Sequence, residues 1–399
     1  MLGRYVVRER IGEGGFGTVY RGEQPQLGRD VVIKVLHKKL RDDPDELKRF
    51  LREGQLASRL DHPYAAHVYG FGVEPEDGLA WLAQEMVAGV TLRRWLELHG
   101  PMPLGQFVPF FERIAEAVQA AHKRGIVHRD LKPSNIMVIE GADGLIPVLL
   151  DFGIAKILPD APAAGVATAR MRAMPPGLTP SDPGSGSPAN HGRLTPSNAV
   201  MGSWAYTSPE QWRNRGVGPA ADTYALGVVV YESLVGRAPF VAETADEYRE
   251  LHCCGWVPGG WVPGVDWDLG PIFQRALAKK PRDRYGNVLE LAAELCAVLR
   301  ESQGLHVSAQ HWENRGRPPG LLWGRDVLAD VRVPSDELGE PACSFFAASQ
   351  RRARRVMWAW GSLAALAVMI VIFGFQYRAE NQTRTAKQVT EATKTQAAL

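Results

Sequence analysis

Apolar and polar positions divide the 399-residue chain into three stretches. Up to about residue 83, short β-branched runs such as Val31-Val32-Ile33 predict strands. From there to about residue 300, apolar residues recur with helical spacing, and segment 104–124 carries a wide apolar face suited to the middle of a helical lobe. Near the end, residues 356–377 form an uncharged run long enough to cross a bilayer core. The pattern predicts a β-rich part, a larger helical part and a membrane span.

Two polar motifs interrupt the helical stretch. Residues 128–135 read H-R-D-L-K-P-S-N, and D-F-G begins at Asp151. Phosphoryl transfer to a hydroxyl needs a proton acceptor, a cation beside the moving phosphate and oxygen ligands for Mg2+. Asp130 fits the acceptor, Lys132 the cation, and Asn135 with Asp151 the metal ligands. These motifs therefore predict a phosphoryl-transfer site.

The same motifs resemble the catalytic loop and D-F-G turn of the protein-kinase superfamily. The resemblance covers about residues 5–300; the Lys132-Pro133 pair is similar to the serine/threonine branch, and the chain resembles the eukaryotic-like kinases of bacteria. It implies an α+β, two-lobed fold followed by one transmembrane helix: a small β-rich N-lobe at about 5–83, a hinge at 84–89 and a larger α-helical C-lobe at 90–300. It also implies ATP with Mg2+, or Mn2+ in its place, as cofactors and serine and threonine hydroxyls of proteins as acceptors.

A glycine-rich run begins the predicted nucleotide site. Its G-x-G-x-x-G spacing is shared with dinucleotide-binding folds, but Thr18-Val19-Tyr20 continues as a strand, which favours a hairpin that folds over phosphates; a plain glycine turn is the alternative. The side chain of Gln84 is expected to control access to the pocket behind the adenine. The resemblance implies that the nucleotide contacts Ile11, Gly12, Glu13, Gly14, Gly15, Phe16, Gly17, Val19, Val32 and Lys34, and the backbone of Glu85 and Val87.

Two charged side chains are predicted to face inward. The period of two places Lys34 on the same strand face as Val32 and Leu36, where a lysine needs an anionic partner; an exposed strand edge is the alternative. Segment 45–60 reads as a helix with Glu53 on its apolar stripe, although glutamates on helices more often face solvent. The resemblance implies that Lys34 grips the ATP phosphates and pairs with Glu53. The predicted catalytic set is Asp130, Lys132, Lys34 and Glu53.

The segment after Asp151 is unusually long. About sixty residues separate Asp151 from Ser208-Pro209-Glu210, and residues 159–199 are rich in Pro, Gly, Ala and Ser. Such a composition cannot bury a core and predicts a disordered insertion in the activation segment. We expect autophosphorylation at one or more of the hydroxyl residues here, above all at Thr195 or Ser197, with the phosphate docking on Arg129; an inert linker is the alternative. These hydroxyl residues are Thr168, Thr179, Ser181, Ser185, Ser187, Thr195 and Ser197.

Two further contacts follow from the resemblance. Glu210 is expected to pair with Arg284, and Asp222, which opens an apolar helix, is expected to brace the catalytic loop.

Charge and cysteine content narrow the range of partners. The formal net charge is only +2 and no basic stripe crosses the first 300 residues, which argues against nucleic acid. The four cysteines lack metal-ligand spacing and are expected to be reduced thiols in a cytoplasmic region. No apolar signal run opens the chain.

The C-terminal stretch predicts attachment to the cell membrane by a single pass. Segment 301–355 is read as a juxtamembrane linker with at most one short helix, 356–377 as the transmembrane helix and 378–399 as a short extracytoplasmic tail. Four arginines at 351–355 place the kinase domain in the cytoplasm by the positive-inside rule, and they can hold anionic headgroups of the lipid bilayer. Pairing of two copies, a homodimer, is one route to activation.

Three other functions remain open. An ATP-binding pseudokinase scaffold normally lacks one of the catalytic residues, and none is missing here. The peptide-docking turn at 202–210 disfavours a small-molecule phosphotransferase, and the short tail disfavours a receptor with an extracellular sensor.

Overall fold

The computed structural model describes residues 2–13, 17–142, 144–152, 203–259, 262, 265, 268–330 and 339–396. The chain divides into two compact units, residues 1–300 and 301–399. Gly14, Gly15 and Phe16 of the glycine run lie outside the described residues, as does the predicted insertion at 159–199.

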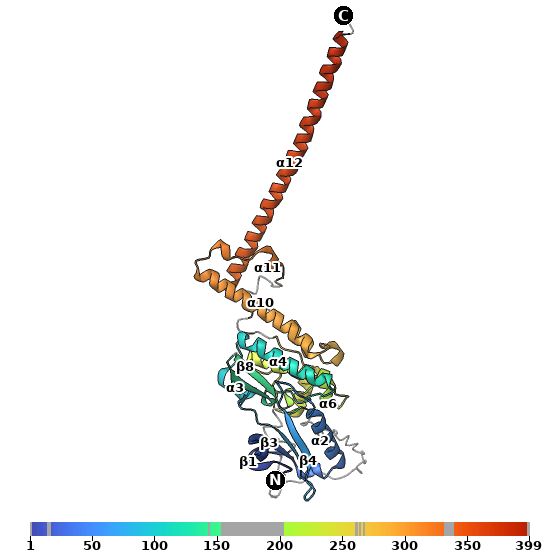
Figure 1. Cartoon of the computed structure of the whole chain (residues 1–399), viewed down its shortest axis with the longest axis vertical. Coiled ribbons are helices and arrows are strands. Elements are labelled where there is room, and N and C mark those ends of the chain that lie inside the picture. The colour runs from blue at the N-terminus through green and yellow to red at the C-terminus, as the bar shows by residue number, and fades with distance from the viewer. Residues whose placement is uncertain are drawn as a thin grey trace, which may run out of the picture. The chain divides into compact units, whose positions relative to one another are not determined.

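A five-stranded antiparallel sheet, in the order β1-β2-β3-β5-β4, forms most of the N-lobe (Figure 1). Its strands are β1 (Val6–Glu13), β2 (Gly17–Gln24), β3 (Arg29–Leu36), β4 (Val68–Val73) and β5 (Ala80–Glu85). The small helix α1 (Lys38–Arg41) precedes α2 (Pro44–Ala57). Helix α2 starts where Asp43 accepts hydrogen bonds from the backbone nitrogens of residues 45 and 46, an N-cap that satisfies otherwise unpaired donors. The predicted helix at 45–60 is confirmed, and it ends three residues earlier than predicted.

The two faces of this sheet bury different side chains. Leu36 and Leu82 pack with Phe50 of α2 on one face. Val31 and Ile33 pack with Tyr5 on the other. Because Lys34 shares the face of Leu36, its side chain points to the side that carries α2, as the period of two predicted.

In its described residues the C-lobe is mainly helical and carries a small sheet, β6-β7-β8. Its elements are β6 (Val90–Thr91), α3 (Leu92–His99), α4 (Leu104–Lys123), β7 (Ile136–Gly141), β8 (Gly144–Leu149), α6 (Pro209–Trp212), α7 (Pro219–Val235), α8 (Ala245–Cys254), α9 (Gly270–Ala276) and α10 (Val288–Asn314). Helix α7 is buried on nearly all sides, which explains why its sequence is apolar all round. Strands β7 and β8 form an antiparallel hairpin that leads to Asp151.

The second unit is more ordered than the sequence analysis predicts. Helix α10 continues to Asn314, α11 spans Arg325–Asp330, and α12 runs from Ala342 to Gln396. Leu305 and Trp312 are buried against Phe345 and Phe346, with the rings of Trp312 and Phe345 5.6 Å apart. Segment 301–355 therefore includes a small packed cluster, which we call the juxtamembrane core.

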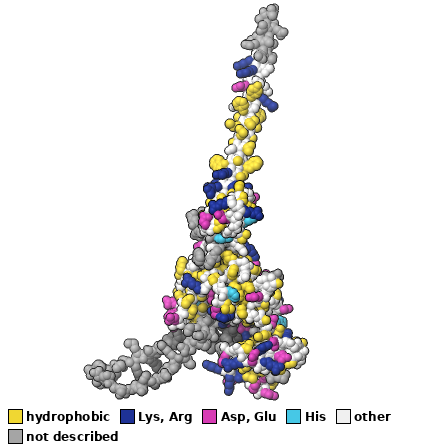
Figure 2. Space-filling view, turned by 90° about the vertical axis from the view of Figure 1, so that its left-hand side faces the viewer, with side chains coloured by type: hydrophobic (Ala, Val, Ile, Leu, Met, Phe, Trp, Pro, Cys, Tyr) yellow, Lys and Arg dark blue, Asp and Glu magenta, His cyan; other side chains and the backbone are white. Residues whose placement is uncertain are grey.

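One described helix, at 342–385, is long and apolar enough to cross a membrane, and its apolar window is not buried in the protein. Figure 2 shows hydrophobic side chains along α12 with Lys and Arg on either side of them.

Candidate active site

A buried carboxylate accepts hydrogen bonds from the backbone of the catalytic loop. Asp222, fully buried at the start of α7, accepts hydrogen bonds from the backbone nitrogens of His128 and Arg129, each at 2.7 Å. His122 Nε2 lies 2.7 Å from the same carboxylate. Arg129 takes the left-handed backbone conformation, with φ 64°, and its carbonyl accepts from Gln211 at 2.9 Å. The predicted bracing role of Asp222 is confirmed.

Three predicted site residues meet on this loop. Lys132 Nζ lies 2.7 Å from Asp130 Oδ2. Asn135 Nδ2 donates to the carbonyl of Asp130 at 2.9 Å and to its Oδ2 at 3.1 Å. Asn135 therefore uses its amide nitrogen to orient Asp130, and its carbonyl oxygen remains the atom suited to a metal ion.

Ser203 adds a hydroxyl that the sequence analysis did not place at the reacting centre. Its Oγ accepts from Lys132 Nζ at 2.6 Å and donates to Asp130 Oδ1 at 3.1 Å. Asp130 thus already takes a hydrogen bond from a hydroxyl. The signal was available in the turn G-S-W-A-Y-T-S-P-E, which sequence analysis treated only as a docking turn.

Asp151 follows the end of β8 by two residues, with φ 62°, and its Oδ1 accepts from Lys34 Nζ. Burial alone would raise the pKa of Asp151, but the charge of Lys34 and hydrogen bonds from Lys34 and Gln84 outweigh burial and lower it. Asp151 is therefore ionised at neutral pH, as an oxygen ligand for Mg2+ must be. The oxygen set of Asn135 and Asp151 suits Mg2+, and the described residues contain no group of three His, Cys, Asp or Glu that could hold a metal ion instead.

The predicted ion pair between Lys34 and Glu53 is not formed in this structure. Lys34 bonds Asp151, while Glu53 Oε1 lies 3.1 Å from Arg129 Nη1. Glu53 does face inward as predicted, with 11% of its side chain exposed. Burial raises its pKa to about 7, against the opposing charge of Arg129. Glu53 thus lies on the predicted face, and in this structure its partner is Arg129 instead of Lys34.

The described residues of the predicted nucleotide site come from adjacent strands. Ile11, Gly12 and Glu13 end β1, Gly17 and Val19 open β2, and Val32 and Lys34 lie on β3. In this register Gly12 pairs with Val19, Val19 with Lys34, and Val32 with Gln84. The prediction that a strand, not a helix, follows the glycine run is confirmed. At Gly17 a Cβ atom would lie 2.0 Å from the carbonyl oxygen of Val35, so only glycine fits there.

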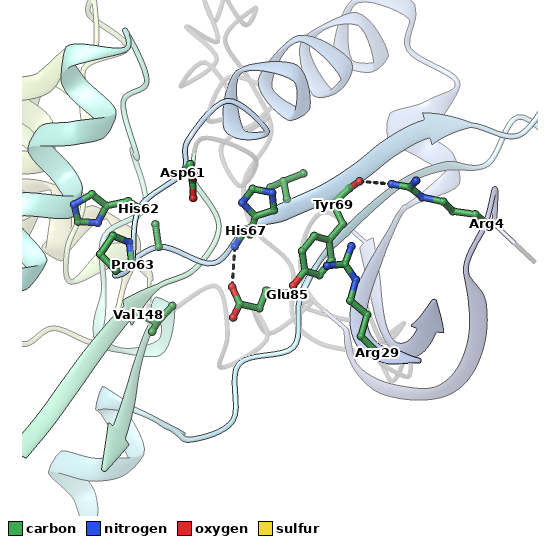
Figure 3. A pocket seen from close by; sticks show the side chains of 11 residues that line it. Arg4, Arg29, Asp61, His62, Pro63, His67, Tyr69, Glu85 and Val148 are labelled. Atoms are coloured by element: carbon green, nitrogen blue, oxygen red, sulfur yellow. Dashed lines mark hydrogen bonds between the residues drawn. The ribbon is translucent and has the colours of Figure 1, made fainter. Parts of the chain in front are cut away.

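At the hinge, the backbone N–H of Glu85 donates to the carbonyl of His67 at 2.8 Å, and its Oε2 accepts from the backbone nitrogen of His67 at 3.1 Å. The carboxylate of Glu85 also lines an open pocket of about 700 Å3 between β4 and residues 61–65 (Figure 3). Lys34, Asp130 and Asp151 do not line this pocket. It is therefore separate from the catalytic groups. Val87, the other hinge residue of the predicted site, follows β5.

Glu210 and Arg284 form a buried bidentate pair, with two N–O distances of 2.8 Å. This confirms the prediction made from the sequence. The pair joins α6 to the turn before α10, and it fixes the segment that carries Ser203.

Two lobes, a catalytic loop on which Asp130 contacts Lys132 and Asn135, and a contact between Asp151 and Lys34 are the arrangement typical of a protein kinase domain. The sequence profile of the family "Protein kinase domain" matches residues 5–284. The chain belongs to the protein kinase family.

Curated relatives and solved structures that are similar to this chain are also kinases. A serine/threonine-protein kinase, pkn3 of Myxococcus xanthus, is 36% identical over 304 residues, which are 75% of this chain and 50% of that protein. The serine/threonine-protein kinase PrkC of Bacillus subtilis is 34% identical over 295 residues, 73% of this chain and 40% of that protein. A crystal structure of a doubly substituted Mycobacterium tuberculosis PknI kinase domain has a TM-score of 0.55 at 24% identity, covering 75% of this chain and 97% of that chain. The chain spans half or less of the length of these two curated relatives.

Proposed function

We propose that this protein is an active serine/threonine kinase that transfers the γ-phosphate of ATP to protein hydroxyls. The observation that carries the proposal is the hydroxyl of Ser203, which donates to Asp130 while it accepts from Lys132. A substrate hydroxyl needs these same two neighbours, an acceptor for its proton and a cation near the transferring phosphate.

In this mechanism Asp130 accepts the proton as the substrate oxygen attacks phosphorus, and the bond between phosphorus and the bridging oxygen of ADP breaks. Lys132 offsets charge on the transferring group, and Lys34 holds the phosphates of the nucleotide. Asn135 and Asp151 would hold Mg2+, which supplies neutralisation of phosphate charge. Residues 11–13, 17, 19 and 32, with the backbone at 85 and 87, would enclose the nucleotide.

Transfer of labelled γ-phosphate by the full chain in detergent, alone and with a generic basic protein, tests this activity. Label that vanishes in Asp130→Asn supports it. A folded chain that binds ATP yet labels nothing, even when two copies are tethered, would instead identify a pseudokinase scaffold.

We also propose that the kinase phosphorylates its own activation segment, at Thr195 or Ser197, and that the phosphate docks on Arg129. The support is the position of Arg129 beside Asp130 and the run of hydroxyl residues in 159–199. Peptide mapping after incubation with ATP tests it; absence of phosphate from residues 160–200 would refute it.

Finally, we propose that α12 crosses a bilayer at 356–377 with the kinase domain in the cytoplasm. Arg352 is engaged locally, because its Nη1 donates to the carbonyls of Pro319 and Leu322 at 2.7 and 2.9 Å. Arg354 and Arg355 therefore remain for anionic headgroups. Basic residues occur on both sides of the span. The proposed orientation therefore depends on the four arginines at 351–355, which are more densely spaced than the basic residues after residue 377.

A membrane-impermeant maleimide tests the orientation in intact cells. A cysteine introduced by Thr393→Cys should react from outside, whereas the exposed native Cys254 should react only after the cells are permeabilised. The reverse pattern would overturn the proposal.

A further inference from the structure

The open pocket beside the hinge is lined by charged side chains that the proposed reaction does not use, and we call it the outer hinge pocket. Its volume of about 700 Å3 lies in the range of sites for small molecules. Figure 3 shows Arg4 and Arg29 on one side of Tyr69, and the carboxylates of Asp61 and Glu85 on the other. Opposite charges are thus separated across one cavity.

Protein contacts already hold the two guanidinium groups of this pocket. Nε of Arg29 donates to Oε1 of the buried Gln24 at 2.8 Å, and its guanidinium carbon lies 3.4 Å from the centre of the Tyr69 ring. Arg4 Nη2 donates to the carbonyl of Tyr69 at 3.0 Å. A guanidinium carries more N–H donors than these contacts use, so both groups can still bind the oxygens of an anion. Because they are held in advance, they lose little conformational freedom when a ligand binds.

The carboxylates on the other side can bind a cation. Oε2 of Glu85 accepts one hydrogen bond from the backbone of His67, and a carboxylate has room for several. The side chain of Asp61 is exposed. Burial lowers the pKa of the neighbouring His62, so this lining side chain is neutral at neutral pH and does not offset the carboxylates. The two arginines and the two carboxylates cancel in charge, which favours a ligand that itself carries both charges.

The walls of the pocket belong to both lobes. The two arginines lie in the N-lobe, before β1 and at the start of β3. The segment that carries Asp61 is tied to β8 of the C-lobe, because the backbone nitrogen of Leu149 donates to the carbonyl of Tyr64 at 2.9 Å. The backbone nitrogen of Ala66 donates in turn to the carbonyl of Leu149 at 2.8 Å. A ligand that bridges the two charged sides therefore bridges the lobes, and it contacts the hinge through Glu85.

We propose that the outer hinge pocket is a regulatory site for a small zwitterionic ligand of the amino acid or short-peptide class. The carboxylate of the ligand binds Arg4 and Arg29, and its ammonium or guanidinium group binds Asp61 and Glu85. The bound ligand fixes the two lobes relative to the hinge and so changes the affinity for ATP; by linkage, ATP changes the affinity for the ligand by the same factor. This coupling rests on the proposed function, since it takes the backbone of Glu85 to contact adenine, whereas binding of the ligand does not.

Isothermal titration calorimetry on the full chain in detergent tests the site, with a panel of arginine, glutamate and the dipeptides Lys-Glu and Glu-Lys as probes. A member of this panel should bind, and Arg29→Gln and Asp61→Asn should each weaken it about tenfold or more, as expected for the loss of a charge-assisted hydrogen bond. Asp61→Asn keeps the shape of an exposed side chain, so its effect does not reflect misfolding. The control is Arg8→Gln, which removes an exposed arginine paired with Glu23 and should leave the affinity unchanged.

The regulatory part is tested by titrating a fluorescent ATP analogue with and without the bound probe. Equal and reciprocal changes in the two affinities would support it, and an unchanged affinity for the analogue would overturn it.

Three other results would overturn the site itself. The first is that no member of the panel binds. The second is that inorganic phosphate binds as tightly as the panel and Asp61→Asn has no effect, which would identify a simple oxyanion site. The third is self-association of the chain that Arg29→Gln abolishes, without binding of the panel, which would identify an interface between copies. Failure of the proposed function is recognised separately, because the wild-type chain would then transfer no label although the probe still binds.

Discussion

Replacing Glu53 by glutamine should change how the stability of the kinase unit depends on pH. The pKa of Glu53 is about 7 instead of 4.5, because burial disfavours the ionised form. When the pKa of a carboxyl is higher in the folded state than in the unfolded state, its contribution to stability is complete at pH values below the unfolded-state pKa. That contribution is lost as the pH rises through the folded-state pKa. The two pKa values differ by about 2.5, and each unit corresponds to about 1.4 kcal/mol. The ionised side chain therefore lowers the free energy of unfolding by about 3 kcal/mol at pH 8.

Glutamine keeps the shape of the side chain and a carbonyl oxygen for Arg129 but cannot ionise. Glu53→Gln should therefore be about as stable as the wild type near pH 5 and more stable near pH 8. The difference in free energy of unfolding between variant and wild type should grow by about 2–3 kcal/mol from pH 5 to pH 8. Thermal unfolding of the full chain in detergent, followed by tryptophan fluorescence at several pH values, measures this gap. The control is Glu97→Gln, which replaces an exposed glutamate on α3. An equal difference from wild type at pH 5 and pH 8 would refute the reasoning.

Three further predictions address the rest of the chain. Arg284→Met should destabilise the kinase unit by about 3–5 kcal/mol, because it leaves the buried carboxylate of Glu210 without its partner; denaturant unfolding would show this as a lower midpoint, and a change below 1 kcal/mol would contradict it. Asp222→Ala should raise hydrogen exchange at the amides of residues 128 and 129 and lower kcat; unchanged protection would count against the bracing role. Phe345→Ala should cost the juxtamembrane core about 3–5 kcal/mol, read as earlier proteolysis within 301–355 at unchanged Tm of the kinase unit.

Much of the fold could be predicted because the sequence patterns that indicate it lie within single strands and helices. The period of two placed Lys34 on the correct face of β3, and the apolar helix opened by Asp222 had to be buried. The pair of Glu210 and Arg284 could be named in advance because the resemblance supplied both partners. For these elements, pattern and resemblance pointed to the same arrangement.

The partner of Glu53 could not be predicted in the same way. Periodicity shows which face of a helix is buried, but two cations, Lys34 and Arg129, lie near that face. The choice between them depends on where α2 sits relative to the catalytic loop, and that position is set by tertiary contacts. The hydroxyl of Ser203 was missed for a related reason, since its place beside Asp130 depends on a turn more than seventy residues away in the sequence.

The juxtamembrane core was missed because its two halves are far apart in sequence. Leu305 and Trp312 lie seven residues apart on one face of α10, too few apolar positions to stand out, and their partner Phe345 belongs to α12. The same helix then continues without interruption into 356–377, so the apolar run starts eleven positions after Phe345. At a rise of 1.5 Å per residue, that distance is about 16 Å along the helix axis. If α12 crosses the bilayer as proposed, the juxtamembrane core lies close to the lipid headgroups. A shift of the span would then act directly on the packing around Phe345, because no flexible segment lies between them.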